Sequence, residues 1–224
     1  ALFCFSLNQP APKYKVFVFA IFFLPLKMIY LNFTIFWVEK NVLLTYGENV
    51  NSTLGRKNPM TNQNLFAPDA VFISNQTKQD LVFKEVYEHL RESGYVKGNF
   101  LHHIVEREHN FPTGLDTATL GKNIPNIAIP HTEGEFVNTR LIVPVALKTP
   151  VTFHNMINPS QAIEVKFLFM LLDNDPDGQA ALLAQVMDFL ANTPANELRE
   201  VFNFTDPSAI YAFLEQKFSK KKED

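Results

Sequence analysis

The 224-residue sequence contains a single cysteine, Cys4. One cysteine excludes an intramolecular disulfide framework, and it excludes a cysteine-based metal cluster or cysteine nucleophile in the rest of the chain. A reducing compartment therefore fits best. The chain also lacks a basic stripe, because its net charge is −3 and the one lysine run, residues 220–222, is followed by two acids. We therefore expect no nucleic acid as a partner.

Charge is divided unevenly along the chain. Residues 1–59 hold six Lys and Arg against two acids, whereas residues 60–224 hold fourteen against twenty-one. The first segment is rich in Phe, Ile, Leu and Asn, and it shows neither the helical nor the strand periodicity of a segment that packs on a core. We therefore place a boundary at residue 60 and expect one domain over 60–224.

Three interpretations of residues 1–59 are open. Residues 16–38 are long enough to span a bilayer, but Lys27, Pro25 and Asn32 within them oppose insertion. A packed extension of the domain is the second interpretation. The third, which we favour, is an apolar leader that is non-native or weakly packed, because position 1 is Ala and Met60 opens a stretch typical of a soluble N-terminus. A signal peptide is disfavoured, since no small-residue cleavage site follows residues 16–26.

Strand and helix patterns alternate from residue 60 onward. The sequence predicts a strand over 65–74, then a helix capped by Asn75 or Thr77 and ended by Gly94. The apolar face of that helix is predicted to hold Leu81, Val82, Val86 and Leu90. A second helix is predicted from residue 97 or 98 to about 108, and a short strand over 127–129.

Apolar runs at 141–147 and 165–172 predict two strands that are buried on both faces of a sheet. A helix is predicted over 175–192, and shorter ones open at Thr193-Pro194 and Asp206-Pro207. The apolar face of the first of these is predicted to hold Leu182, Leu183, Val186, Met187 and Leu190. The expected fold is α/β, a single three-layer domain with a mixed sheet flanked by helices, preceded by an apolar N-terminal segment.

The strand at 127–129 runs directly into Pro130 and His131. Proline fixes its own φ near −65° and biases the residue before it toward extended geometry, so the backbone ahead of His131 is stiff. A histidine held in this way is either a structural accident or a positioned chemical group.

Three short elements surround this histidine in the sequence: Arg107-Glu108, Pro112-Thr113-Gly114 and Ala128-Ile129-Pro130-His131. Their order and spacing resemble the active-site region of the enzyme IIA proteins of the bacterial phosphoenolpyruvate-dependent sugar phosphotransferase system, in the fructose/mannitol superfamily. The resemblance covers about residues 65–218. The longer gap before the histidine and the stretch "VTFHNM" are more similar to the galactitol-type branch than to the fructose or nitrogen-regulatory branches.

The resemblance implies that His131 accepts a phosphoryl group from the phosphohistidine of the carrier protein HPr and passes it to an enzyme IIB partner during sugar uptake. It also implies a cytoplasmic protein that does not bind sugar itself and needs no cofactor. Arg107 matches the arginine of the family's R-E pair, and its guanidinium suits phosphate oxygens. Thr113 and Gly114 are expected to support the phosphate through a hydroxyl and backbone N–H groups.

One position departs from the family pattern. Many relatives carry a second histidine where this chain has Gln179, which donates a hydrogen bond but does not titrate. His103 is the candidate replacement, because it lies four residues before Arg107 on the same helix face. The plainer interpretation is that His102 and His103 are one exposed and one half-buried side chain. His89, His109 and His154 show no metal-ligand spacing, so no metal site is expected.

Two other functional classes remain as alternatives. A nitrogen-type regulatory protein would use the same phosphohistidine at His131 to switch a protein target, and it would need no sugar-specific IIB partner. A membrane-tethered structural protein rests on residues 16–38 alone.

Overall fold

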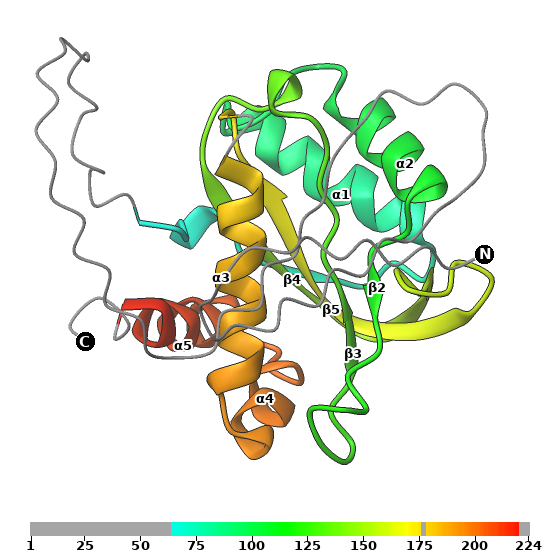
Figure 1. Ribbon diagram of the computed structural model, residues 1–224. Coiled ribbons are helices and arrows are strands. Elements are labelled where there is room, and N and C mark those ends of the chain that lie inside the picture. Colours follow the sequence, from blue (N-terminus) through cyan, green and yellow to red (C-terminus); the bar gives the residue numbers. More distant parts are fainter. Residues whose placement is uncertain (1–63, 176–177, 220–224) are drawn as a thin grey trace, which may run out of the picture. The chain divides into compact units, whose positions relative to one another are not determined.

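The computed structural model describes residues 64–175 and 178–219 (Figure 1). The predictions made for residues 1–59, including the expectation of a weakly packed segment, lie outside the described residues. None of the helices in the described ranges is both long and apolar enough to cross a bilayer.

A mixed five-stranded sheet forms the centre of the domain. Its strands follow the order β1-β4-β5-β3-β2. They are β1 (Phe72–Ser74), β2 (Gly114–Leu115), β3 (Asn126–Ala128), β4 (Leu141–His154) and β5 (Ala162–Leu172). The pairs β1·β4 and β3·β5 are parallel, whereas β4·β5 and β2·β3 are antiparallel. The predicted mixed sheet is confirmed.

Helices cover both faces of the sheet (Figure 1). One apolar cluster joins the sheet to α1 (Gln79–Glu92) and α2 (Phe100–Asn110), and a second joins it to α3 (Gly178–Asn192), α4 (Ala195–Val201) and α5 (Pro207–Ser219). Alternate residues of β5 enter the two clusters, Leu168 and Met170 the first and Phe167 and Phe169 the second. This alternation follows from the two-residue period of a strand. The domain therefore has the three layers expected from the sequence.

Several predicted boundaries were wrong. Of the strand predicted at 65–74 only β1 forms, because Pro68 opens a 3-10 turn, Pro68–Ala70, ahead of it. The strand predicted at 141–147 continues to His154, since Val151 and Phe153 are buried at alternate positions after a shift in register. Helix α2 begins later than expected, at Phe100, because the Lys97 N–H instead donates to the Phe136 carbonyl.

The helical faces were predicted with two errors. Val82, Val86 and Leu90 are buried, but Leu81 is 44% exposed and Met187 is 41% exposed. Successive residues on a helix point about 100° apart, so a residue beside the apolar stripe turns outward. The predicted end of α1 is confirmed: Gly94 has φ +76°, and the Tyr95 N–H donates to the Leu90 carbonyl.

Candidate functional site

The backbone around His131 is held from both sides. The Ile129 N–H donates to the Thr113 carbonyl at 3.2 Å, and the Pro130 carbonyl accepts from the Leu171 N–H at 2.9 Å. His131 also forms a parallel bridge with Leu171 of β5. The segment after β3 therefore runs along the central strand, and the histidine is anchored to the rigid part of the fold.

The imidazole of His131 makes a hydrogen bond that decides its tautomer. Its Nδ1 lies 2.9 Å from the Ile129 carbonyl oxygen. A carbonyl can only accept a hydrogen bond, so Nδ1 carries the proton, and in the neutral ring the lone pair is on Nε2. The ring nitrogen that carries the lone pair is therefore Nε2.

Arg107 lies beside that atom. Its Nη2 is 3.4 Å from Nε2 of His131, and its Nη1 donates to the Phe111 carbonyl at 3.0 Å. The guanidinium carbon also lies 4.7 Å from the centre of the Phe111 ring. Phe111 thus holds the guanidinium in place by a hydrogen bond and a cation–π contact. An anion attached to Nε2 would meet a fixed positive charge.

The surroundings of His131 favour its neutral form. Burial lowers the pKa of the imidazole, and the positive charge of Arg107 lowers it further. The hydrogen bond to Ile129 and the negative charge of Glu133 act in the opposite direction without reversing the shift. The Nε2 lone pair is therefore available at neutral pH.

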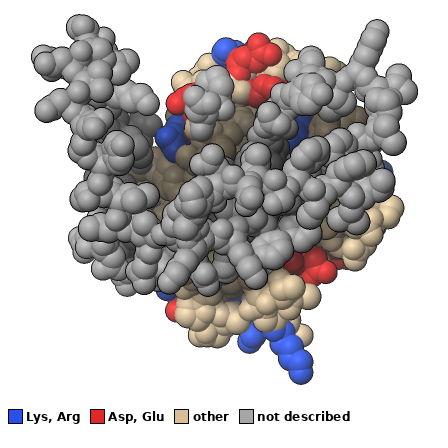
Figure 2. All heavy atoms as spheres, viewed as in Figure 1, with Lys and Arg blue, Asp and Glu red and all other residues tan. Residues whose placement is uncertain are grey.

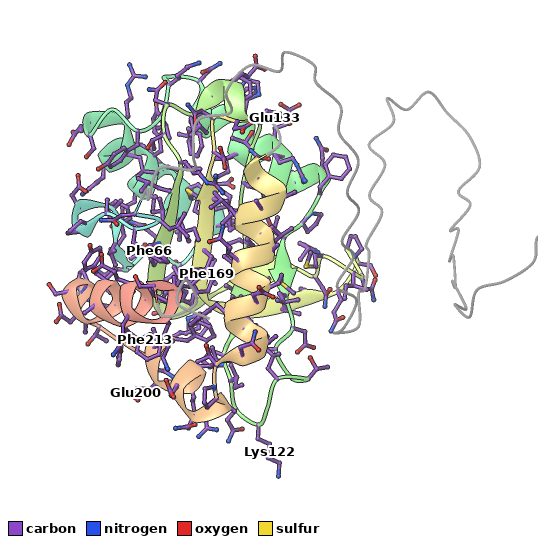
Figure 3. All side chains as sticks on the ribbon, turned by 60° about the vertical axis from the view of Figure 1, so that its left-hand side comes forward. Phe66, Lys122, Glu133, Phe169, Glu200 and Phe213 are labelled. Atoms are coloured by element: carbon purple, nitrogen blue, oxygen red, sulfur yellow. The ribbon has the colours of Figure 1, made fainter. Side chains whose placement is uncertain are left out.

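Glu133 is the acidic group of the site. Burial opposes its ionisation, but hydrogen bonds, above all from the Thr132 hydroxyl at 2.6 Å, and the charges of Arg107 and His103 bring its pKa below the ordinary value. Figure 3 shows Glu133 beside the first turn of α3, at the opposite end of the domain from Lys122. The site thus has a negative charge as well as a positive one.

Glu108 lies behind Arg107 on the same helix and is 3% exposed. Its Oε1 accepts from the Thr113 N–H at 2.9 Å, and its Oε2 accepts from the Thr113 hydroxyl at 2.7 Å. Burial raises the pKa of Glu108 to about 7, although both contacts with Thr113 and the charge of Arg107 oppose the rise.

Thr113 is placed differently from the expectation. It is buried, and its hydroxyl is already donated to Glu108, so in this structure it is not a free donor for phosphate. Gly114 is tied to the β4–β5 hairpin, since its carbonyl accepts from the Met156 N–H at 2.7 Å. Both residues of the turn serve the framework behind His131.

Gly114 is required by a close approach of two backbones. A Cβ atom at this position would lie 2.5 Å from the His154 carbonyl oxygen, which cannot move aside as a side chain does. We expect Gly114→Ala to lower the free energy of unfolding by about 1–3 kcal/mol, the usual cost of overpacking. Urea denaturation followed by circular dichroism measures it.

Gly98→Ala is the control for that measurement. Its Cβ would meet only the flexible end of the Arg91 side chain, so a change within about 0.5 kcal/mol is expected. Equal stability of Gly114→Ala and Gly98→Ala would contradict the close approach.

Gln179 reaches the site from the first turn of α3. Its Nε2 donates to the Thr132 carbonyl, so it contacts the residue that follows His131. Gln179 therefore lies next to the His131 segment, as the sequence comparison with the family's second histidine suggested, and its hydrogen bond there is to a backbone carbonyl.

His103 stacks on Phe136, with ring centres 3.6 Å apart and planes within 7°, and its Nδ1 lies 4.0 Å from Glu106. Its side chain is 30% exposed, whereas that of His102 is 76% exposed. The plainer interpretation of the pair is confirmed. His103 reaches the site through its charge on Glu133, and none of its described contacts is with His131.

Sequence reasoning missed three residues of the site: Glu108, Phe111 and Glu133. Glu108 was visible as the second residue of the Arg-Glu pair, but a glutamate next to an arginine on a helix is usually solvated. Nothing in the local sequence marks Phe111 as a support for Arg107. Phe111 is 56% exposed, so no apolar pattern includes it.

Within residues 64–175 and 178–219 no group of three or more His, Cys, Asp or Glu side chains is placed to hold a metal ion. In the coloured, described part of the face in Figure 2, acidic and basic side chains form small separate groups within a larger uncharged surface. Among the groups described above, the guanidinium of Arg107 beside His131 is the positive group that an anion at this site would meet.

Comparisons with known proteins agree with this geometry. No curated protein matches the chain. Among solved structures, the fold is similar to a IIA protein of Streptococcus mutans (21% identity, 68% of this chain and 90% of that one, TM-score 0.52). It is also similar to IIA mannitol from Escherichia coli, with 15% identity over 66% of this chain and 98% of that one and a TM-score of 0.52. A third similar structure is the complex of enzyme IIA and phosphorylated enzyme IIB for mannitol from the same organism, with 14% identity over 69% of this chain and 97% of that one and a TM-score of 0.52.

The family model of the phosphoenolpyruvate-dependent sugar phosphotransferase system, EIIA 2, matches residues 64–217. This range contains every described strand, His131 and Arg107. The chain therefore belongs to the EIIA type 2 family of phosphoryl-carrier domains of the sugar phosphotransferase system.

Proposed function

We propose that His131 accepts a phosphoryl group from the phosphohistidine of HPr and passes it to an enzyme IIB partner during sugar uptake. The observation that carries this proposal is the placement of Nε2, which carries no proton and lies 3.4 Å from the Arg107 guanidinium. Family membership supports it independently.

The chemical step follows from this placement. The Nε2 lone pair attacks phosphorus, the P–N bond to the donor histidine breaks, and its electron pair returns to the donor nitrogen. The phosphoryl group is then held on His131 by a new P–N bond. Positive charge that develops on the ring is stabilised by the Nδ1–H bond to the Ile129 carbonyl, and the guanidinium of Arg107 meets the phosphoryl oxygens.

A group bound in this way is easily passed on, because a phosphoramidate is a high-energy bond. Positioning supplies much of the rate of phosphoryl transfer, and His131 is held by backbone contacts on both sides. The solved complex of the mannitol IIA and phosphorylated IIB proteins supports an enzyme IIB as the acceptor. Because the proposed donor HPr is a cytoplasmic protein, the proposal includes a cytoplasmic location for this domain.

The assignment to a branch is part of the proposal. The stretch "VTFHNM" and the longer gap before the histidine favour the galactitol type. In the structure residues 151–156 form the end of β4 and the start of the turn after it, and the Met156 N–H donates to Gly114 close to the site. Transfer to a galactitol-type IIB, compared with a mannitol-type IIB, tests this assignment.

The experiment that tests the function is phosphorylation of the full chain by phosphoenolpyruvate, enzyme I and HPr, followed by addition of IIB proteins. Labelling followed by transfer to IIB is the expected result. Labelling that no IIB removes would favour the nitrogen-type regulatory alternative, and absence of labelling would overturn the proposal.

Deletion of residues 1–59 is expected to leave phosphoryl acceptance and thermal stability essentially unchanged. Residues 60–224 contain all the site residues and both apolar clusters, and the family model begins at residue 64. Differential scanning calorimetry and the labelling rate measure the two effects. Misfolding of the protein that starts at Met60 would show that the first segment is part of the domain.

A further inference from the structure

Hydrogen bonds link the buried carboxylate of Glu108 to His131 through two residues, Thr113 and Ile129. Glu108 accepts both the N–H and the hydroxyl of Thr113. The carbonyl of Thr113 accepts from the Ile129 N–H at 3.2 Å, and the carbonyl of Ile129 accepts from Nδ1–H of His131 at 2.9 Å. The N–H and the carbonyl of Thr113 belong to different peptide groups, as do those of Ile129, so Glu108 acts on the imidazole by fixing the positions of these two residues.

Two neighbouring residues of helix α2 are linked to the imidazole, one directly and one through other residues. Arg107 lies directly against Nε2, and Glu108, the next residue, acts on Nδ1 through Thr113 and Ile129. Successive helical residues point about 100° apart, which allows one to face the site and the other to face the interior. The two routes reach different nitrogens, so together they orient the ring.

Burial of Glu108 needs an explanation beyond packing. A glutamate is almost never fully buried unless it is paired, and a buried carboxylate costs free energy unless hydrogen bonds compensate it. Both described hydrogen bonds of this carboxylate are with one residue, Thr113, which is itself buried and leads to the site. An apolar residue would fill this space without that cost, but it would leave the Thr113 N–H without this acceptor.

We infer that Glu108 is a positioning residue for phosphoryl transfer, which holds His131 with Nδ1 protonated and Nε2 free by fixing Thr113 and, through it, Ile129. The inference rests on the proposed function of His131 as the phosphoryl acceptor. Glu108 does not touch the reacting atoms, so it is not itself a catalytic residue.

The protonation state of Glu108 changes near neutral pH, because burial raises its pKa to about 7. Only the ionised carboxylate accepts from both the N–H and the hydroxyl of Thr113. Protonation makes the carboxyl a donor and requires the Thr113 hydroxyl to turn around. The contact between Glu108 and Thr113 therefore has two states, and the ionised state predominates above about pH 7.

Other groups face Glu108. Arg107 and His109 lie on the same helix, and His154 of β4 lines the same hollow as Glu108, together with the uncharged Gln79 of α1. Because these two imidazoles line the same hollow as Glu108, an experiment on Glu108 needs a histidine variant as a control.

Glu108→Gln in the full chain is the test, because it preserves the shape of the side chain and removes the charge and one acceptor. We expect the rate of phosphorylation by HPr to fall by about tenfold to a hundredfold, the range known for outer partners of metal-binding imidazoles. Nitrogen-15 NMR of the His131 ring is expected to show a smaller share of the Nδ1–H tautomer. The shifts of this ring in the wild type should also show an inflection near pH 7 that Glu108→Gln lacks.

Four further variants isolate the effect. Glu88→Gln removes an exposed carboxylate of α1 that pairs with Lys84, and it should change neither the rate nor the tautomer. Thr113→Ser keeps the hydroxyl and should behave like the wild type, whereas Thr113→Val should resemble Glu108→Gln. His154→Gln should keep the inflection, which would show that it does not come from that histidine.

The outcomes separate the inference from the proposed function. A wild type that takes no phosphate would overturn the function of His131. A wild type labelled on His131, with an unchanged rate, tautomer and inflection in Glu108→Gln, would overturn the role of Glu108 alone. If Glu108→Gln does not fold, Thr113→Val provides the same test, and an unchanged rate and tautomer in that variant would overturn the inference.

Discussion

His131→Ala is expected to accept no phosphate from phosphorylated HPr. The substitution removes the Nε2 lone pair, and no other described histidine contacts Arg107 through a ring nitrogen. The imidazole is half-buried, and within the described residues its hydrogen bonds are to Ile129 and Arg107, so the variant is expected to fold. Labelling with radioactive phosphoenolpyruvate, with circular dichroism as the check on folding, measures the loss.

His102→Ala and His109→Ala are the matched controls. Both side chains are exposed on α2, the helix that carries Arg107. They should be labelled like the wild type, and the label should be lost in acid and kept in base, as a phosphoramidate requires. Labelling of His131→Ala at the rate of the wild type would overturn the assignment of the nucleophile.

Arg107→Ala is expected to slow phosphoryl acceptance by roughly a hundredfold or more. Removing a preorganised positive group from a phosphoryl-transfer site costs on the order of a few kcal/mol of transition-state stabilisation. Arg107 is held by Phe111 with its Nη2 3.4 Å from Nε2 of His131. Rapid-quench kinetics with phosphorylated HPr measures the effect.

Arg107→Lys should recover only part of the rate, since the ammonium group is a point charge without the planar fork. Arg199→Ala is the control, because that exposed guanidinium donates to the Lys122 carbonyl at the far end of the domain. Equal rates for the wild type and Arg107→Ala would make Arg107 an ordinary surface arginine.

Local patterns predicted the fold class well and the limits of its elements less well. The apolar runs that became β4 and β5 reflect strands that are buried on both faces, and the stripe Val82, Val86 and Leu90 reflects burial that repeats with the period of a helix. Leu81 and Met187 were assigned to buried faces and are exposed. Periodicity locates the middle of an apolar stripe more sharply than its edge.

The sequence by itself determined which groups are available: a histidine behind a stiff proline, an Arg-Glu pair, a glutamine in place of a second histidine, and one cysteine. It also determined that strands and helices alternate. These properties depend on residue type and on neighbours along the chain, so no tertiary information is needed to see them.

Only the tertiary structure decided which groups meet. Arg107 and His131 are 24 residues apart and Gln179 and Thr132 are 47 apart, yet both pairs are in contact. The order of strands in the sheet brings β3, β5 and the start of α3 together, and local patterns do not encode that order. The free nitrogen of His131 and the role of Glu108 depend on contacts made in this way, because a tautomer and a buried charge are set by neighbours in space.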